Sequence, residues 1–191
     1  FYTILDDVFA LRDMDDAADG GKVKERYNGS GATVRGFNVE GRAAFTRWFE
    51  LQAGVTLQQS RYKEPEFWSE DAEVPPVRRM FRTPDAYGYF TASFKPVRNF
   101  TADLSGTCTG SMLVQHMAGS GVAQDVAVST PSFFDMNIRL SYDVRIYKEI
   151  TMQLYGGVQN LFNAYQKDFD KGVDRDSGYI YGPSLPRSWF V

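Results

Sequence analysis

The stretch Phe134–Ile146, FDMNIRLSYDVRI, decides the fold class. Its even-numbered residues are all apolar or aromatic, and its odd-numbered residues are all polar or charged. Successive side chains of a β-strand point to opposite faces of a sheet, whereas a helix would mix the two sets on every side. This alternation without an exception predicts a long β-strand with one apolar face and one polar face.

The same alternation recurs along the rest of the chain. Further strands are predicted over residues 37–45, 49–58, 86–94, 100–114 and 150–158, with a less regular strand at 2–12 and a last one from 188. Within 100–114 only Leu113 breaks the pattern. Short connections near 46–48, 95–98 and 147–149 alternate with long ones near 13–30, 63–82, 115–132 and 164–182. These lengths predict an all-β, antiparallel up-and-down arrangement of about eight strands, with four long loops at one end and tight turns at the other.

The length and chemistry of the predicted strands favour a transmembrane β-barrel. Strands usually have about 5–6 residues, whereas a tilted strand that crosses a bilayer uses about 9–11. Asp103, Asp135, Arg139 and Asp143 all lie on the polar faces of their strands, and aromatic residues such as Trp48 gather near strand ends. Lipid penalises charge on the outward face, and aromatic girdles lie at the two interfaces. A water-soluble antiparallel barrel or sandwich, which also alternates, is the alternative.

Composition excludes several other classes of protein. The 191 residues include 21 Lys and Arg against 24 Asp and Glu, a net charge of −3, so no basic excess indicates a nucleic-acid partner. Mean hydropathy is −0.37, and no run approaches the ~18 apolar residues of a membrane helix. The polar lumen-facing residues of a barrel lower this average. Cys108 is the only cysteine, which excludes an internal disulfide, and its place on an apolar face favours a small packing or lipid-facing residue.

Both ends of the sequence have the composition of strands. Phe1–Leu5 and Ser188–Val191 are mostly apolar, whereas chain termini are usually polar and loosely held. We therefore expect a piece of a longer chain, with any export signal upstream.

The last part of the chain carries two sequence elements about twenty residues apart. The first, Asn160, Leu161, Phe162 and Asn163 with Tyr165, follows a predicted strand, and the second, Pro186 and Arg187, leads into the final apolar residues. Asn tolerates the left-handed backbone of turns, and Pro suits the first residue of a strand. At the mouth of that strand the Arg187 guanidinium is placed to fork onto neighbouring carboxylates.

In this order the two elements resemble the C-terminal end of TonB-dependent outer-membrane receptors. The stretch Gly36–Gly41 also resembles strand starts of these barrels. The resemblance implies that residues 1–191 are the C-terminal portion of a barrel of about twenty-two strands, without its plug domain and TonB-contacting segment. It implies energy-coupled uptake of a scarce large ligand (a ferric siderophore, cobalamin or haem) across the outer membrane of a Gram-negative bacterium. The expected partners are outer-membrane lipid, the TonB complex and the nutrient, and no enzyme activity is expected.

The long loops supply the candidate ligand contacts. Aromatic and Arg side chains at a barrel mouth suit an anionic, ring-bearing ligand. These candidates are Phe67, Trp68, Arg78, Arg79, Phe81 and Arg82, with girdle and loop packing as the alternative. His116, the only histidine, is interpreted as a ligand or haem contact or as an ordinary loop residue. The second interpretation is favoured because one His without partners makes no metal site.

An acidic segment raises the question of calcium. Asp168, Asp170, Asp174 and Asp176 have the oxygen ligands that Ca²⁺ prefers, so they are a possible calcium site in an extracellular loop. A solvated loop is the default interpretation, because Lys171 and Arg175 neutralise part of the charge and the distal Glu of an EF-hand is missing. A second acidic stretch, Asp13, Asp15, Asp16 and Asp19, has the same default.

Three other functions stay open. A soluble β-barrel binding protein would fold in water as a closed barrel. A barrel-embedded hydrolase, such as a lipase or protease, would require His116 to be a catalytic residue paired with Ser or an acid near the rim. A passive porin is disfavoured by the two C-terminal elements.

Overall fold

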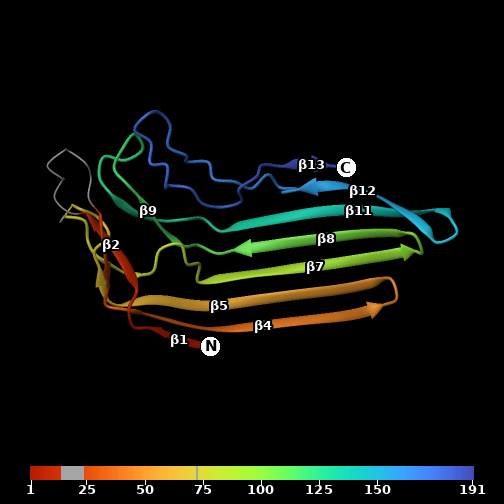
Figure 1. The fold of residues 1–191 in the computed structure, drawn as a ribbon, viewed down its shortest axis with the longest axis horizontal. Coiled ribbons are helices and arrows are strands. Elements are labelled where there is room, and N and C mark those ends of the chain that lie inside the picture. Colours follow the sequence, from red (N-terminus) through yellow and green to blue (C-terminus); the bar gives the residue numbers. More distant parts are fainter. Residues whose placement is uncertain (14–23, 72) are drawn as a thin grey trace.

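The computed structural model describes residues 1–13, 24–71 and 73–191, which form strands and loops (Figure 1). The strands are β1 (Tyr2–Leu5), β2 (Phe9–Asp13), β3 (Lys24–Asn28), β4 (Ala32–Thr46), β5 (Phe49–Glu66), β6 (Val77–Arg79), β7 (Ala86–Val97), β8 (Phe100–Thr109), β9 (Leu113–His116), β10 (Val126–Ser129), β11 (Phe133–Tyr147), β12 (Ile150–Gln159) and β13 (Ser188–Phe190). None of the described residues belongs to a helix with the length and hydropathy of a membrane span.

One antiparallel sheet organises the chain. Its strands follow the order β1-β4-β5-β7-β8-β11-β12-β13, and β6 pairs with β5 beside this path. Neighbours in the sheet are consecutive strands of the meander, so the predicted up-and-down topology of about eight strands is confirmed. Within the described residues the path starts at β1 and ends at β13 without closing. The chain by itself is therefore an open, curved wall.

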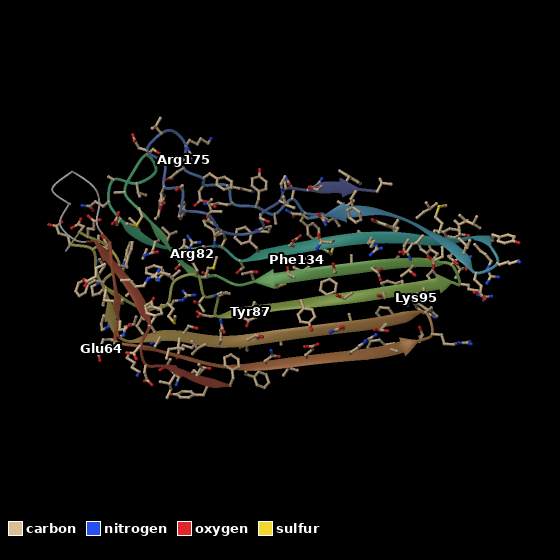
Figure 2. The ribbon with its side chains drawn as sticks, in the orientation of Figure 1. Glu64, Arg82, Tyr87, Lys95, Phe134 and Arg175 are labelled. Carbon is tan, nitrogen blue, oxygen red and sulfur yellow. The ribbon has the colours of Figure 1, made fainter. Side chains whose placement is uncertain are left out.

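The two ends of the sheet differ as predicted. Figure 1 shows tight turns at one end, joining β4 to β5, β7 to β8 and β11 to β12. The long connections all lie at the opposite end. In Figure 2, Lys95 marks the tight-turn end, whereas Glu64 and Arg175 lie at the loop end.

The alternation of Phe134–Ile146 sets the register at the centre of the sheet. Leu140 lies opposite Ala102 on β8 and Gly156 on β12, and Arg139 lies opposite Asp103 and Gly157. Directly opposed residues share a face of the sheet. Apolar residues are therefore aligned on one face across several strands, and charged residues on the other.

The apolar face of the sheet is open. Phe37, Leu57, Leu140 and Ile146 expose 61%, 52%, 46% and 58% of their surface. A soluble sheet buries such a face against a second layer. Here the hydrophobic cluster of fully buried residues (Val114, Tyr179 and Tyr181) lies outside this sheet, in the long loops. The arrangement fits a wall whose apolar face contacts lipid, and it gives no support to the soluble-barrel alternative.

Side-chain hydrogen bonds join neighbouring strands across the polar face. Gln52 donates to Glu40 at 2.8 Å, and the Ser93 hydroxyl donates to Asp103 at 2.6 Å. Gln153 donates to Asp143 at 2.9 Å. Each bond satisfies a carboxylate that faces away from the apolar side.

Several predicted loops contain strands of their own. β2 pairs with β3, and β9 pairs with β10, each pair forming a separate two-stranded sheet. The predicted strand 2–12 is split after Leu5, because the chain leaves β4 there and β2 pairs with β3 instead. The predicted strand 100–114 ends at Thr109, and Leu113, the residue that breaks the alternation, begins β9. Most of the acidic stretch, residues 15, 16 and 19, lies outside the described residues.

Candidate functional site

Three long connections fold together at the loop end of the sheet. We call residues 67–71 with 73–85, 110–132 and 160–187 the loop cap. The Arg82 guanidinium donates to the carbonyl oxygens of Gly178 and Ile180, the latter at 2.9 Å. The backbone of Arg82 has a positive φ of 56°, a strained conformation for a residue other than glycine. Ser69 donates to Asp125 at 2.6 Å, which joins the first connection to the second. The three segments therefore form one unit.

His116 lies in the interior of the loop cap. Its Nε2 atom is 3.0 Å from both carboxylate oxygens of Asp170, and its ring stacks on Tyr179 with centroids 3.7 Å apart. Only 8% of its side chain is exposed, and 4% of that of Asp170. The hydrogen bonds from the backbone N–H of Asp176 and from His116 lower the pKa of Asp170. His116 therefore joins two loops through a buried contact.

Two tyrosines share one carboxylate beside this pair. The Tyr179 and Tyr181 hydroxyls donate to the two oxygens of Asp168 at 2.7 and 2.5 Å. Burial opposes the charge of Asp168, but these two hydrogen bonds hold its pKa below the ordinary value. Burial first, and then Asp168, raise the pKa of Tyr181 to about 12, and the pKa of Tyr179 is raised for the same reasons. Gln166, 1% exposed, bonds to the backbone of both tyrosines and completes the cluster.

The four aspartates proposed for calcium have separate hydrogen-bond partners. Asp176 accepts from the backbone N–H groups of Met117 and Gly178, and Asp174 accepts through its backbone carbonyl from Ser120. Among residues 1–13, 24–71 and 73–191, no three acidic, His or Cys side chains are grouped to hold a metal ion. The acidic loop instead binds its own backbone and the neighbouring loop, so the calcium hypothesis gains no support from this geometry.

A pocket with aromatic walls opens where the loop cap meets the ends of β2 and β5. It has a volume of about 250 Å³. Its aromatic lining residues are Phe9, Tyr62, Phe67, Trp68 and Phe81. The rings of Trp68 and Phe81 meet edge to face with centroids 5.3 Å apart. Glu66, Ser30 and Gln115 add polar groups. Such a pocket accepts one ring or apolar group of a ligand, with a few polar atoms to orient it.

The structure brings together only part of the predicted ligand-contact set. Phe67, Trp68 and Phe81 line the pocket. Arg78 turns to Glu64, and Arg79 to Asp85 and the carbonyl of Ser111. Arg82 holds the loop cap, and His116 is buried, so neither lines the pocket. For these arginines and His116, direct ligand contact stays a prediction that this arrangement does not support.

The C-terminal sequence elements form a connected turn. Asn160 and Asn163 both have positive φ angles, of 50° and 53°. The Asn160 side-chain amide donates to the carbonyl oxygens of Ala164 and Leu185, the latter at 2.8 Å. Its side-chain oxygen accepts from the backbone N–H of Ala164. Asn163 accepts from the backbone N–H of Arg187 at 3.0 Å. The two elements therefore fix the approach of the chain to β13.

The other residues of these elements differ in role. Phe162 stays 56% exposed and packs its ring near Phe134, on the apolar side. The predicted ion pair of the Arg187 guanidinium is absent among the described residues. The Arg187 side chain is exposed, and only the backbone N–H of this residue is bonded. Tyr165 is 39% exposed, and no role follows from its position.

Sequence reasoning missed two sets of residues. The first is the pocket residue Tyr62, which lies on the same face of β5 as Gln58 and Ser60. If the strand predicted over 49–58 had been continued to Glu66, its alternation would have assigned Tyr62 to this face. The Asp168 cluster had a weaker signal, the alternation of Tyr179 and Tyr181. Contacts such as Arg82 with Gly178, 96 residues apart, have no local signal at all.

Comparison with known proteins identifies the fold. No protein-family model matches the sequence, and no curated protein is significantly similar to it. The ferric-catecholate import receptor Fiu of Escherichia coli matches with a TM-score of 0.62 and 18% identity over 98% of this chain and 23% of its own. A mutant of the ferric enterobactin receptor PfeA of Pseudomonas aeruginosa matches with a TM-score of 0.60 and 14% identity over 98% of this chain and 27% of its own. The chain has the fold of part of these receptors and spans about a quarter of their length.

Proposed function

We propose that residues 1–191 are the C-terminal part of the barrel of a TonB-dependent outer-membrane receptor that takes up a ferric siderophore. In this proposal β4, β5, β7, β8, β11 and β12 cross the outer membrane, and the loop cap faces the outside of the cell. The remaining strands and a plug domain belong to other parts of the protein. The TonB complex acts on those parts.

The observation that carries this proposal is the combination of an open apolar face and a folded loop cap. Strands of 10 to 18 residues are long enough to cross a bilayer. Their apolar side chains are exposed, whereas the buried hydrophobic cluster lies in the loops. A fold shared with two ferric-siderophore receptors supports the same conclusion.

The aromatic pocket is the proposed ligand contact of this segment. Catecholate siderophores present flat aromatic rings, and Trp68 and Phe81 offer edges and faces for stacking. A volume of about 250 Å³ suits one ring rather than a whole ferric complex. The rest of the ligand would contact loops outside this chain.

Growth on single iron sources tests this function. We expect deletion of the gene that contains this segment to abolish growth on one ferric catecholate under iron restriction, and to spare growth on a ferric hydroxamate. Complementation with the intact gene restores growth. A loss restricted to haem or cobalamin would retain the receptor and overturn the siderophore assignment. Unchanged growth on every one of these nutrients would overturn the uptake function.

The hydrolase alternative finds an acid partner for its histidine but no nucleophile. His116 pairs with an acid, Asp170, but in the described part of the chain no Ser or Cys side chain bonds to its ring. Without a nucleophile within reach, the pair has a structural explanation. We therefore propose binding and transport rather than bond chemistry for this segment.

A further inference from the structure

The apolar face of the sheet carries a groove halfway between its centre and the loop end. The groove has a volume of about 510 Å³ and far more apolar than polar lining. Ala86, Gly88, Gly106, Cys108 and Gly110 form its floor. Four of them lie on the apolar faces of β7 and β8, where Gly88 is directly opposite Cys108, and Gly110 follows the end of β8. Because these side chains are small or missing, the surface is hollow here.

Larger side chains form the walls. Val55 lies opposite Gly88 on one side, and Phe134 lies opposite Cys108 on the other. At the end toward the tight turns the ring of Phe90 covers Gly106, where it leaves no room for an added Cβ atom. The result is an apolar groove over β7 and β8, between Val55 and Phe134.

Arginines lie near the end of the groove that faces the loop cap. The Arg79 guanidinium donates to the carbonyl of Ser111, the residue after Gly110, at 2.9 Å. It also pairs with Asp85, the residue before Ala86, at 2.9 Å. Arg61 lies directly opposite Arg79 in the sheet. The groove therefore leads from apolar floor residues to guanidinium groups.

Two of the cations near this end have no carboxylate partner among the described residues. Arg61 shares a face of β5 with Val55 and Leu57 and is exposed. Arg35 is also exposed, and its guanidinium bonds only to the Gln59 side chain, at 2.7 and 3.1 Å. Since Thr33 opposes Arg61 and Arg35 opposes Gln59, the two arginines are diagonal neighbours, about 7–8 Å apart. Two acids in this region have partners of their own, Asp85 with Arg79 and Asp6 with Lys63.

We propose that this surface is a binding site for a phosphate-bearing lipid of the outer leaflet, with one acyl chain in the groove and a phosphate held by Arg35 and Arg61. A guanidinium pair matches phosphate in charge and geometry. A hollow lined by glycine, alanine and cysteine accepts a flexible hydrocarbon chain. The inference rests on the proposed membrane location, because only then does the apolar face contact lipid.

Native mass spectrometry of the intact, delipidated protein in detergent tests this site. The probes are purified lipid A, which carries phosphates and acyl chains, a phosphatidylcholine of similar chain length, and inorganic phosphate. We expect a stoichiometric adduct with lipid A and weaker binding of the zwitterionic lipid. The Arg35→Gln/Arg61→Gln double variant should bind lipid A about tenfold less tightly. Arg78→Gln, on the opposite face of β6, is the matched control and should leave binding unchanged.

A second pair of variants tests the groove. Cys108→Phe fills it and should weaken lipid A binding, whereas Ala43→Phe adds the same side chain to an exposed apolar position on β4 and should not. Equal affinity for both lipids, or an unchanged affinity in the double arginine variant or in Cys108→Phe, would overturn the proposal. So would binding of inorganic phosphate as tight as that of lipid A. Iron uptake is measured on the same variants. If uptake persists but the protein shows no preference for lipid A, the lipid site is refuted and the proposed uptake function is not.

Discussion

His116 places its Nε2 atom 3.0 Å from both carboxylate oxygens of Asp170, although 54 residues separate the two in sequence. The contact joins the end of β9 to the last long connection, and the Tyr179 ring covers it. The single histidine of the chain is thus the central support of the loop cap.

Replacing this histidine should loosen the loop cap without unfolding the strands. His116→Ala removes one of the two hydrogen-bond partners of the almost fully buried Asp170 carboxylate and the stacking partner of Tyr179, and buried polar atoms without partners are costly. We expect protease cleavage within 164–182 to become at least several times faster. Limited proteolysis of the intact protein in detergent measures this. Arg175→Ala, an exposed residue of the same loop whose side chain bonds only to the carbonyl of Gly172, is the control. Equal cleavage rates in the two variants would contradict the role of His116.

Acid should loosen the same region. The pKa values of Asp168 and Asp170 are lowered in the folded protein, so their contribution to stability is present at neutral pH and is lost as the pH falls below about 4. We expect the near-ultraviolet circular dichroism of Tyr179 and Tyr181 to change in that range while the far-ultraviolet strand signal persists. Asp168→Asn should show a smaller change between pH 7 and pH 3. A change centred well above pH 4 would contradict the assignment to these two aspartates.

The strands were far easier to predict than the loop cap. Alternation over Phe134–Ile146 predicted β11 almost to the residue, whereas the single strand predicted over 100–114 was wrong beyond Thr109, where β8 ends and β9 begins only at Leu113. Alternation is a local property, because it depends only on which face of one strand each residue occupies. The contact of Arg82 with Gly178 depends on how separate loops meet, and the turn chemistry of either segment does not encode it. For the same reason sequence reasoning grouped Arg78 with Trp68, although only the aromatic residue reaches the pocket.

The aromatic pocket should contribute to ligand affinity. Trp68→Ala and Phe81→Ala each remove one ring of an edge-to-face pair. One aromatic contact is worth about 0.5–1.5 kcal/mol, so we expect the Kd for the transported ferric siderophore to rise about two- to twelvefold. Quenching of intrinsic fluorescence or radiolabelled ligand binding to whole cells measures the Kd. Phe162→Ala, an exposed ring at the same end of the sheet and outside the pocket, should leave it unchanged.

Asn160 should be critical for the last turn. Asn160→Ala loses three side-chain hydrogen bonds at a residue that is 2% exposed. It also leaves an alanine at a φ of 50°, a backbone conformation that alanine tolerates less well than asparagine. We expect a loss of about 2–4 kcal/mol, from unpaired backbone groups and backbone strain together. Asn160→Gly tolerates the φ angle and loses only the hydrogen bonds, so it should be less damaging. Urea denaturation of the folded protein in detergent ranks the two, and a glycine variant as unstable as the alanine variant would exclude a contribution from strain.

The central claim, that the sheet crosses the outer membrane with its loop cap outside, has a direct test. In a Cys108→Ser background, single cysteines are placed at Val173, 96% exposed in the loop cap, and at Glu149, in the tight turn between β11 and β12. Intact cells are treated with a polymer-linked maleimide too large to enter the periplasm. We predict that Val173→Cys reacts in intact cells and that Glu149→Cys reacts only after the outer membrane is permeabilised. Equal labelling of the two positions in intact cells, or labelling of Glu149→Cys alone, would contradict the account.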